Sequence, residues 1–308
     1  MILIERRSRW ARTLVTAGLA VALGVGVVAP ADAAVTSGHR GRLVVVAGVY
    51  PLAWLARQVG GSEVRVTDLT PPGVEPHDLE LSTADRDRID GADLVLTVGG
   101  SFQPAVERAA QARSRGTVDL FRTLGLAGPG SGPGDDPHLW LHLPEWRRAV
   151  EAVRVALRQA RPEAAATFTT GADRVEADLA ALDDRYRAGL AECRRHLVAT
   201  VHDAFGGLAR YGVDPEALTG RAPEAEPDAR RLGDLADRMR RDGATTVFTE
   251  PREPPSIART LAREGGAARV AVLDPVERLS AVQQRRGDDY LTVMGRNLRA
   301  LRTALGCA

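Results

Sequence analysis

Short apolar runs of strand length, alternating with amphipathic helical segments, set the fold available to this chain. The first half has the order strand 43–49, helix 52–59, strand 64–69, helix 82–90, strand 92–98, helix 102–115 and strand 117–120. A strand that leads through a helix to the next strand is typical of a parallel sheet covered by helices. The first half is therefore predicted to be an α/β lobe.

The second half returns to this alternation after a long helical stretch at 144–193, which is interrupted near Arg161 and Pro162. The later segments are strands at 197–201, 245–249 and 269–273 and helices near 229–241, 256–264 and 288–305. We therefore expect an α/β protein of two lobes, each with a parallel sheet flanked by helices, joined by a long helix. The expected parts are a signal peptide at 1–33, an N-terminal lobe at 34–162, an interlobe helix at 163–192 and a C-terminal lobe at 193–308.

The first 33 residues are typical of an export signal. Four arginines precede an uncharged run at 14–28, and the small residues Ala31 to Ala33 follow Pro30. A basic start, an apolar centre and an A-x-A end favour cleavage after Ala33. The alternative is an uncleaved membrane anchor, but the run of 15 residues is short for a span of about 20 residues. We expect an exported protein, either periplasmic or at the cell surface.

Export also bears on the two cysteines, Cys193 and Cys307. An even number of cysteines in an oxidising compartment makes this pair a disulfide candidate. Two unpaired, buried thiols remain the alternative.

The charged residues exclude several classes of function. The 41 basic residues are all Arg and stand against 40 acidic residues, so the net charge of +1 gives no sign of a nucleic-acid partner. Because the chain has no Lys, it lacks the lysine of a P-loop, of a protein kinase and of Schiff-base enzymes.

Three histidines and one aspartate stand at places where ligands of α/β proteins gather. His77 is in the loop after strand 64–69, His202 and Asp274 end later strands, and His138 follows a Gly- and Pro-rich segment at 125–134. Ligands bind beyond the carboxyl ends of parallel strands, and three imidazoles with one carboxylate suit a tetrahedral Zn²⁺. Single histidines are commonly structural, so the residues by themselves leave both roles open.

The other histidines are expected to have supporting or surface roles. His142 lies four residues after His138, but Pro137 and Pro144 favour a turn there. We therefore expect His142 to hold a ligand in place or to cap a helix, and not to bind the metal itself. His39 is expected in a flexible N-terminus of the mature chain, and His196 is expected at the surface.

Several separated segments, in order, resemble one known family. These segments are VVVAGVYPLAW, PPGVEPHDLE, DPHLWLHLPEW, HDAFGGLARYGV, VFTEPREPP, VLDPVERL and DDYLTVMGRNLRAL. They are similar to the zinc/manganese-type (cluster A-I) solute-binding proteins of bacterial ABC transporters. The resemblance runs from about residue 43 to residue 305.

The resemblance implies a metal site in a cleft between two lobes joined by a rigid helix. The family's ligands fall on His77 in PPGVEPH, His138 in DPHLW, His202 in HDAF and Asp274 in LDP. Manganese-preferring members commonly have Glu at the third position, so His202 favours zinc. Glu250 in FTEP is expected to support the site rather than to bind the metal.

The function that this implies is an exported receptor, not an enzyme, that captures Zn²⁺ and delivers it to an ABC membrane permease. We expect a monomer that binds a divalent metal ion and no nucleic acid. The alternatives are a manganese or iron receptor of the same fold, a secreted zinc hydrolase with Glu250 or Asp274 as general base, and an adhesion module with a structural metal. No HExxH motif supports the hydrolase.

Two departures from the family pattern concern His138. His142 stands where the family usually has Asp, so the hydrogen bonds around His138 are expected to differ. The Gly- and Pro-rich segment ends in only two acids, Asp135 and Asp136, so metal capture by that segment is not expected.

Overall fold

The computed structural model describes residues 41–71, 74–126, 136–220, 228–251 and 253–308. The export signal expected at 1–33, His39 and most of the segment 125–134 lie outside the described residues. In the described part of the chain, no helix is long and apolar enough to cross a membrane. Residues 39–308 form one compact unit by their contacts, and the lobe boundaries expected from the sequence stay predictions.

The first sheet has four parallel strands in the order β2-β1-β3-β4. The strands are β1 (Leu43–Ala47), β2 (Val64–Asp68), β3 (Leu94–Thr97) and β4 (Thr117–Asp119). The helices between or beside them are α1 (Tyr50–Gly60), α2 (Thr83–Asp90), α3 (Pro104–Gln111) and α4 (Leu120–Thr123). The two central strands are rich in Val and Leu and almost wholly buried, as expected for strands covered on both faces.

The second sheet repeats this arrangement with the strand order β6-β5-β7-β8, again all parallel. The strands are β5 (Leu197–Thr200), β6 (Asp214–Ala217), β7 (Thr246–Thr249) and β8 (Arg269–Val272), and α7 (Ala229–Asp242) and α8 (Ser256–Glu264) accompany them. The sequence pattern did not predict β6, whose sequence is DPEA. A strand that contains Pro is tolerated at the edge of a sheet, and β6 is an edge strand.

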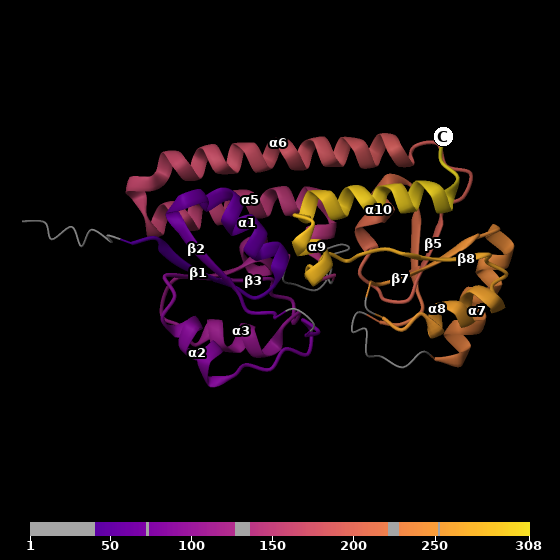
Figure 1. The fold of residues 1–308 in the computed structure, drawn as a ribbon, viewed down its shortest axis with the longest axis horizontal. Coiled ribbons are helices and arrows are strands. Elements are labelled where there is room, and N and C mark those ends of the chain that lie inside the picture. Colours follow the sequence, from indigo (N-terminus) through magenta and orange to yellow (C-terminus); the bar gives the residue numbers. More distant parts are fainter. Residues whose placement is uncertain (1–40, 72–73, 127–135, 221–227, 252) are drawn as a thin grey trace, which may run out of the picture. The chain divides into compact units, whose positions relative to one another are not determined.

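Three long helices lie side by side along the two sheets (Figure 1). They are α5 (Leu143–Ala160), α6 (Ala165–Leu190) and α10 (Tyr290–Leu305), with the short α9 (Ala281–Arg285) before α10. The 26-residue α6 confirms the long helix expected from the sequence, and it packs against α1 and α5 as well as α10. Gly171 permits close packing against α1, since a Cβ there would lie 2.3 Å from the carbonyl oxygen of Val59.

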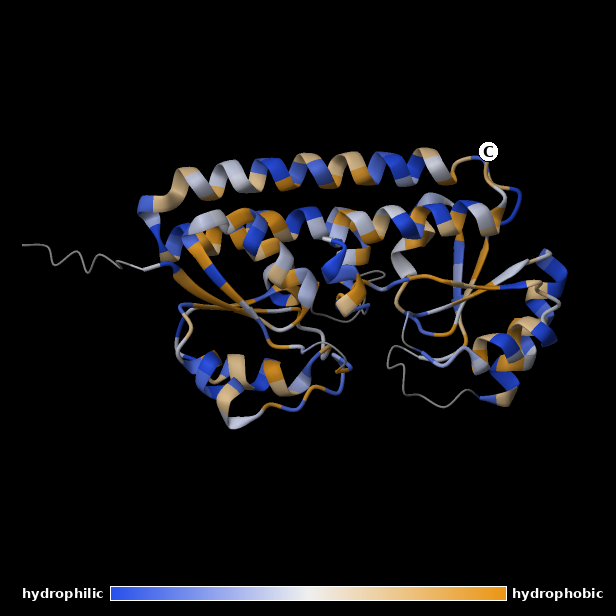
Figure 2. Cartoon of the chain, in the orientation of Figure 1, coloured by the Kyte–Doolittle hydropathy of each residue, from blue (hydrophilic) through white to orange (hydrophobic). Residues whose placement is uncertain are grey.

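One hydrophobic core extends through elements of both halves. It includes residues of β1 and α1, of the three long helices and of the loop after β8. The strands are among the most hydrophobic segments, whereas α6 alternates hydrophobic and hydrophilic residues along its length (Figure 2). A disulfide joins Cys193, just after α6, to Cys307, just after α10. Of the two possibilities left open by the sequence, a disulfide or two unpaired thiols, the disulfide is therefore confirmed.

Candidate metal centre

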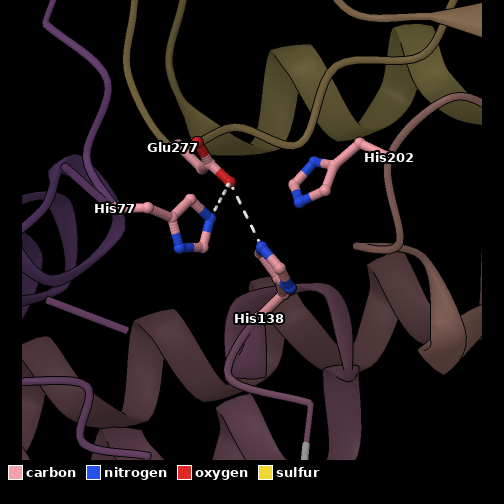
Figure 3. Close-up of side chains that lie close together, drawn as sticks. All are labelled: His77, His138, His202 and Glu277. Carbon is pink, nitrogen blue, oxygen red and sulfur yellow. Dashed lines mark ion pairs between the residues drawn. The ribbon is translucent and has the colours of Figure 1, made fainter. Parts of the chain in front are cut away.

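Four side chains from distant parts of the chain converge on one point (Figure 3). They are His77, His138, His202 and Glu277, and one nitrogen or oxygen atom of each lies within 4.8 Å of those of the others. His77 follows β2, His202 follows β5 and Glu277 follows β8, while His138 directly precedes the 3₁₀ turn Leu139–Leu141. The structure thus brings together the three histidines singled out in the sequence, beyond the carboxyl ends of strands from both sheets.

The fourth member of this cluster is Glu277, and Asp274, the carboxylate expected from the sequence, is not among its members. One oxygen of Asp274 accepts a hydrogen bond from the backbone N–H of Val276 (2.8 Å), and the other accepts one from Nε2 of Gln283 (2.8 Å). Asp274 therefore folds back on its own chain and closes a turn. Glu277, three residues farther on, is the carboxylate that lies beside the three histidines.

The turn between Asp274 and Glu277 is held from several sides. The side chain of Asn297, in α10, accepts a hydrogen bond from the backbone N–H of Asp274 (3.0 Å) and donates one to the backbone carbonyl oxygen of Asp274 (2.7 Å). The indole of Trp140 donates to the carbonyl oxygen of Pro275 (2.6 Å). Val276 has a φ of +60°, a left-handed conformation that costs a β-branched residue free energy and persists only where its surroundings impose it.

Carboxylates behind two of the histidines orient their rings. Nδ1 of His138 lies 2.7 Å from Oδ1 of Asp136, which also accepts the backbone N–H of His138 (3.0 Å). Nδ1 of His202 contacts Oε1 of Glu250. A carboxylate on one ring nitrogen leaves the other to face a metal and fixes the orientation of the ring. Glu250 thus has the supporting position expected from the sequence.

The other oxygen of Asp136 binds His142, at 2.9 Å from Nε2. One carboxylate therefore links His138 to His142, which stands outside the four-residue cluster as the sequence analysis expected. Asp136 itself was not predicted to contact His138. The sequence signal was its position two residues before that histidine, at the end of a segment whose structure cannot be read from composition.

His77 is held by a polar network that sequence reasoning also missed. Nε2 of Gln103 donates to the carbonyl oxygen of Pro76 (3.2 Å) and to Oγ1 of Thr70 (3.1 Å), whose hydroxyl donates to the carbonyl oxygen of Gly48 (2.7 Å). These bonds attach the backbone just before His77 to the first sheet. The ring of Phe102 covers that of His77 at a centroid distance of 4.4 Å.

The pKa values of His138 and Glu277 shift in opposite directions because each group is buried beside groups of opposite charge. Burial lowers the pKa of His138, but Asp136 and Glu277 outweigh it and raise that pKa to about 9. Burial raises the pKa of Glu277, but the neighbouring histidines outweigh it and hold that pKa well below its usual range. Burial raises the pKa of Glu250 well above its usual value, and the charge of Glu277 adds to this increase. These shifts favour an anionic Glu277 and a protonated His138 in the metal-free protein.

Three polar atoms in the cluster are buried and make no hydrogen bond within the described residues: Nε2 of His77, Nε2 of His138 and Oε1 of Glu277. Oε1 of Glu277 lies 3.6 Å from the first nitrogen and 3.2 Å from the second. Buried polar atoms are nearly always satisfied. Atoms bound to a tetrahedral cation by bonds of about 2.0–2.2 Å lie roughly 3.4 Å apart, so this arrangement suits a divalent transition-metal ion.

The chain is similar to known metal-binding proteins. The family model described as "Zinc-uptake complex component A periplasmic" matches residues 45–304. The zinc-binding protein AdcA of Streptococcus pyogenes is 31% identical over 288 residues, covering 85% of this chain and 56% of that protein. The manganese-binding lipoprotein MntA of Bacillus subtilis is 29% identical over 217 residues, covering 68% of this chain and 71% of that protein. The chain spans about half the length of AdcA, 56%.

The chain also has the fold of solved structures of metal-binding proteins. The Zn(II)-bound ZnuA-like domain of AdcA from Streptococcus pneumoniae superposes with a TM-score of 0.74 at 29% identity, covering 86% of this chain and 99% of that one. The periplasmic zinc-binding protein TroA of Treponema pallidum shares the fold with a TM-score of 0.76 at 23% identity, covering 86% of this chain and 99% of that one.

Proposed function

The chain belongs to the family of periplasmic zinc-uptake complex component A, and on this basis we propose that it is a receptor that captures Zn²⁺ and delivers it to an ABC permease. The family match confirms the resemblance read from the sequence motifs. The family description names the periplasm, in agreement with the export signal expected at 1–33. A disulfide between Cys193 and Cys307 also suits an oxidising compartment.

The observation that carries this proposal is the convergence of three imidazoles and one carboxylate, in which, within the described chain, buried atoms of His77, His138 and Glu277 are partnered only by one another's charge. We propose that His77, His138, His202 and Glu277 are the zinc ligands. Nitrogen-rich donor sets with one carboxylate fit zinc better than manganese, which prefers more oxygen donors. The names of the zinc-binding AdcA relatives support the same metal.

The proposed role is binding without catalysis. Four protein ligands complete a tetrahedral zinc and leave no coordination position for a reactive water. A hydrolase would also need a general base near the metal, and the two residues considered for it have other contacts. Glu250 lies against His202, and both oxygens of Asp274 accept hydrogen bonds within their own loop. The relatives' names likewise describe binding proteins and not enzymes.

Metal titration of the chelator-treated protein tests the proposal. Competition with a chromophoric chelator should give one tight Zn²⁺ per chain, with Mn²⁺ displacing it only at far higher concentration. His202→Ala should weaken zinc binding by about 10²-fold or more, because it removes a ligand. His196→Ala is the matched control, because the His196 ring contacts the carbonyl oxygen of Gly212 and is not in the cluster. Absence of tight zinc binding, or a preference for Mn²⁺, would reject the proposed metal.

Delivery to a permease needs a separate test in cells. Deletion of this chain should slow growth in zinc-limited medium, and added zinc should restore growth. Deletion of the membrane permease that it serves should give the same defect, and the double deletion should be no worse. A strain whose zinc-limited growth is unaffected would contradict a role in uptake.

A further inference from the structure

A single arginine joins the two loops that bring His77 and Glu277 to the metal centre. Nη1 of Arg278 donates to the backbone carbonyl oxygen of Val74 (3.0 Å) and to Oε2 of Glu75 (3.0 Å). Glu75 lies in the loop after β2, and Arg278 lies 203 residues later in the loop after β8. We propose that this contact of Arg278 with Glu75 and Val74, here called the clasp, slows the release of the bound metal ion.

The position of the clasp supports this role. Glu75 is two residues before His77, and Arg278 directly follows Glu277. The clasp therefore connects the same two loops that a bound metal would connect, through residues that neighbour the proposed ligands in the sequence. Neither residue belongs to the ligand cluster, so both are positioning residues.

The clasp is also shielded from solvent. The side chains of Arg278 and Glu75 are 17% and 19% exposed. An ion pair between fully exposed side chains contributes little, whereas a charge-assisted hydrogen bond with restricted solvent access is stronger. The second bond, to a backbone carbonyl oxygen, fixes the guanidinium against the loop itself and not only against a side chain.

This arrangement predicts an effect on the rate of release more than on the rate of capture. The bonds from Gln103 keep the loop after β2 attached to the first sheet, while Asn297 and Trp140 keep the turn after β8 in place. When the metal leaves, separation of the two loops must break the clasp. The inference rests on the proposed function, because it concerns the rate at which the site loses its metal.

Stopped-flow release of zinc tests the clasp. Protein loaded with one equivalent of Zn²⁺ is mixed with excess chromophoric chelator, and the dissociation rate constant is compared between Arg278→Gln, Glu75→Gln, the double variant and wild type. Each single variant should release zinc about 3- to 10-fold faster, as expected for loss of a partly shielded ion pair. The double variant should be no faster than the faster single variant, because both remove one interaction. Arg147→Gln is the control, since it breaks an ion pair with Glu176 between α5 and α6, and it should release zinc at the wild-type rate.

The outcomes separate the clasp from the proposed function. Wild type that binds no zinc overturns the proposed function. Wild type that binds zinc, with variants that release it at the wild-type rate or with additive effects in the double variant, overturns the clasp alone. Circular dichroism checks that each variant folds. If Arg278→Gln does not fold, Glu75→Gln decides the question, because it removes the same ion pair and leaves the arginine in place.

Discussion

Replacement of Glu277 by Gln should abolish tight zinc binding, whereas replacement of Asp274 by Asn should not. Glu277 is 2% exposed and is the anionic member of a cluster whose other members are histidines. With neutral histidines, the carboxylate leaves a net charge of +1 on the bound Zn²⁺ site, and Glu277→Gln leaves +2 in the same buried place. Removal of one partner from a buried charge pair costs about 3–5 kcal/mol, which is roughly 10²- to 4 × 10³-fold in Kd.

Asp274→Asn keeps an acceptor for the backbone N–H of Val276 but removes the acceptor for Nε2 of Gln283, because the amide nitrogen of Asn is itself a donor. The turn loses about 1 kcal/mol, so we expect a change in Kd of about 10-fold or less. The assay is competition between each folded variant and a chelator of known zinc affinity at pH 7.5, with thermal unfolding of the metal-free proteins as a check on the fold. A larger loss for Asp274→Asn than for Glu277→Gln would refute the assignment of Glu277 as the fourth ligand.

Three further predictions concern the support of the site and of the fold. Asp136→Asn should weaken zinc binding by about 10- to 100-fold, because it replaces the carboxylate that orients the ring of His138 by a neutral amide. A chelator titration that gives the wild-type Kd would contradict this role. Reduction of the Cys193–Cys307 disulfide should lower the free energy of unfolding by about 2–5 kcal/mol, measured by urea denaturation with and without reductant, and coincident curves would show that it adds no stability. Burial raises the pKa of Asp68 to about 7, so the folded protein holds a proton there that the unfolded chain has lost above about pH 4, and stability falls as the pH rises from about 4 to 7. Asp68→Asn should remove this loss and gain about 3 kcal/mol at pH 8 relative to pH 4.5, and an equal effect of the substitution at both pH values would exclude it.

The sequence predicts those parts of the fold that depend on continuous apolar runs. The central strands β1, β3, β5 and β7 are such runs, and the long α6 follows from its helical periodicity. The edge strand β6 could not be predicted in this way, because Pro215 and its acidic neighbours have low strand propensity, and its pairing with β5 is a tertiary effect.

The same distinction applies to the metal centre. His77 and His202 could be found because they stand at or near the ends of predicted strands, and His138 because it lies in the motif DPHLW. Asp274 has the same position in the sequence, but the backbone reverses at Val276 and directs Glu277 inward instead. A left-handed valine cannot be predicted from local preference, since Val disfavours that conformation. Asp136 and Gln103 were missed because their contacts depend on loops whose paths are set by tertiary packing.

The continuous α6 restricts the motion that could distinguish the metal-loaded from the empty state of the proposed receptor. The helix packs against elements of both halves, and the disulfide fastens the chain beyond its end to the chain beyond α10. A wide swing of one sheet away from the other would have to bend this helix or expose its apolar face to water, at a cost of about 25 cal/mol for each Å² of apolar surface. For the proposed receptor, loaded and empty molecules should therefore have nearly superimposable scattering profiles, and the proposed permease would have to distinguish them by the local shape of the loops around the ion.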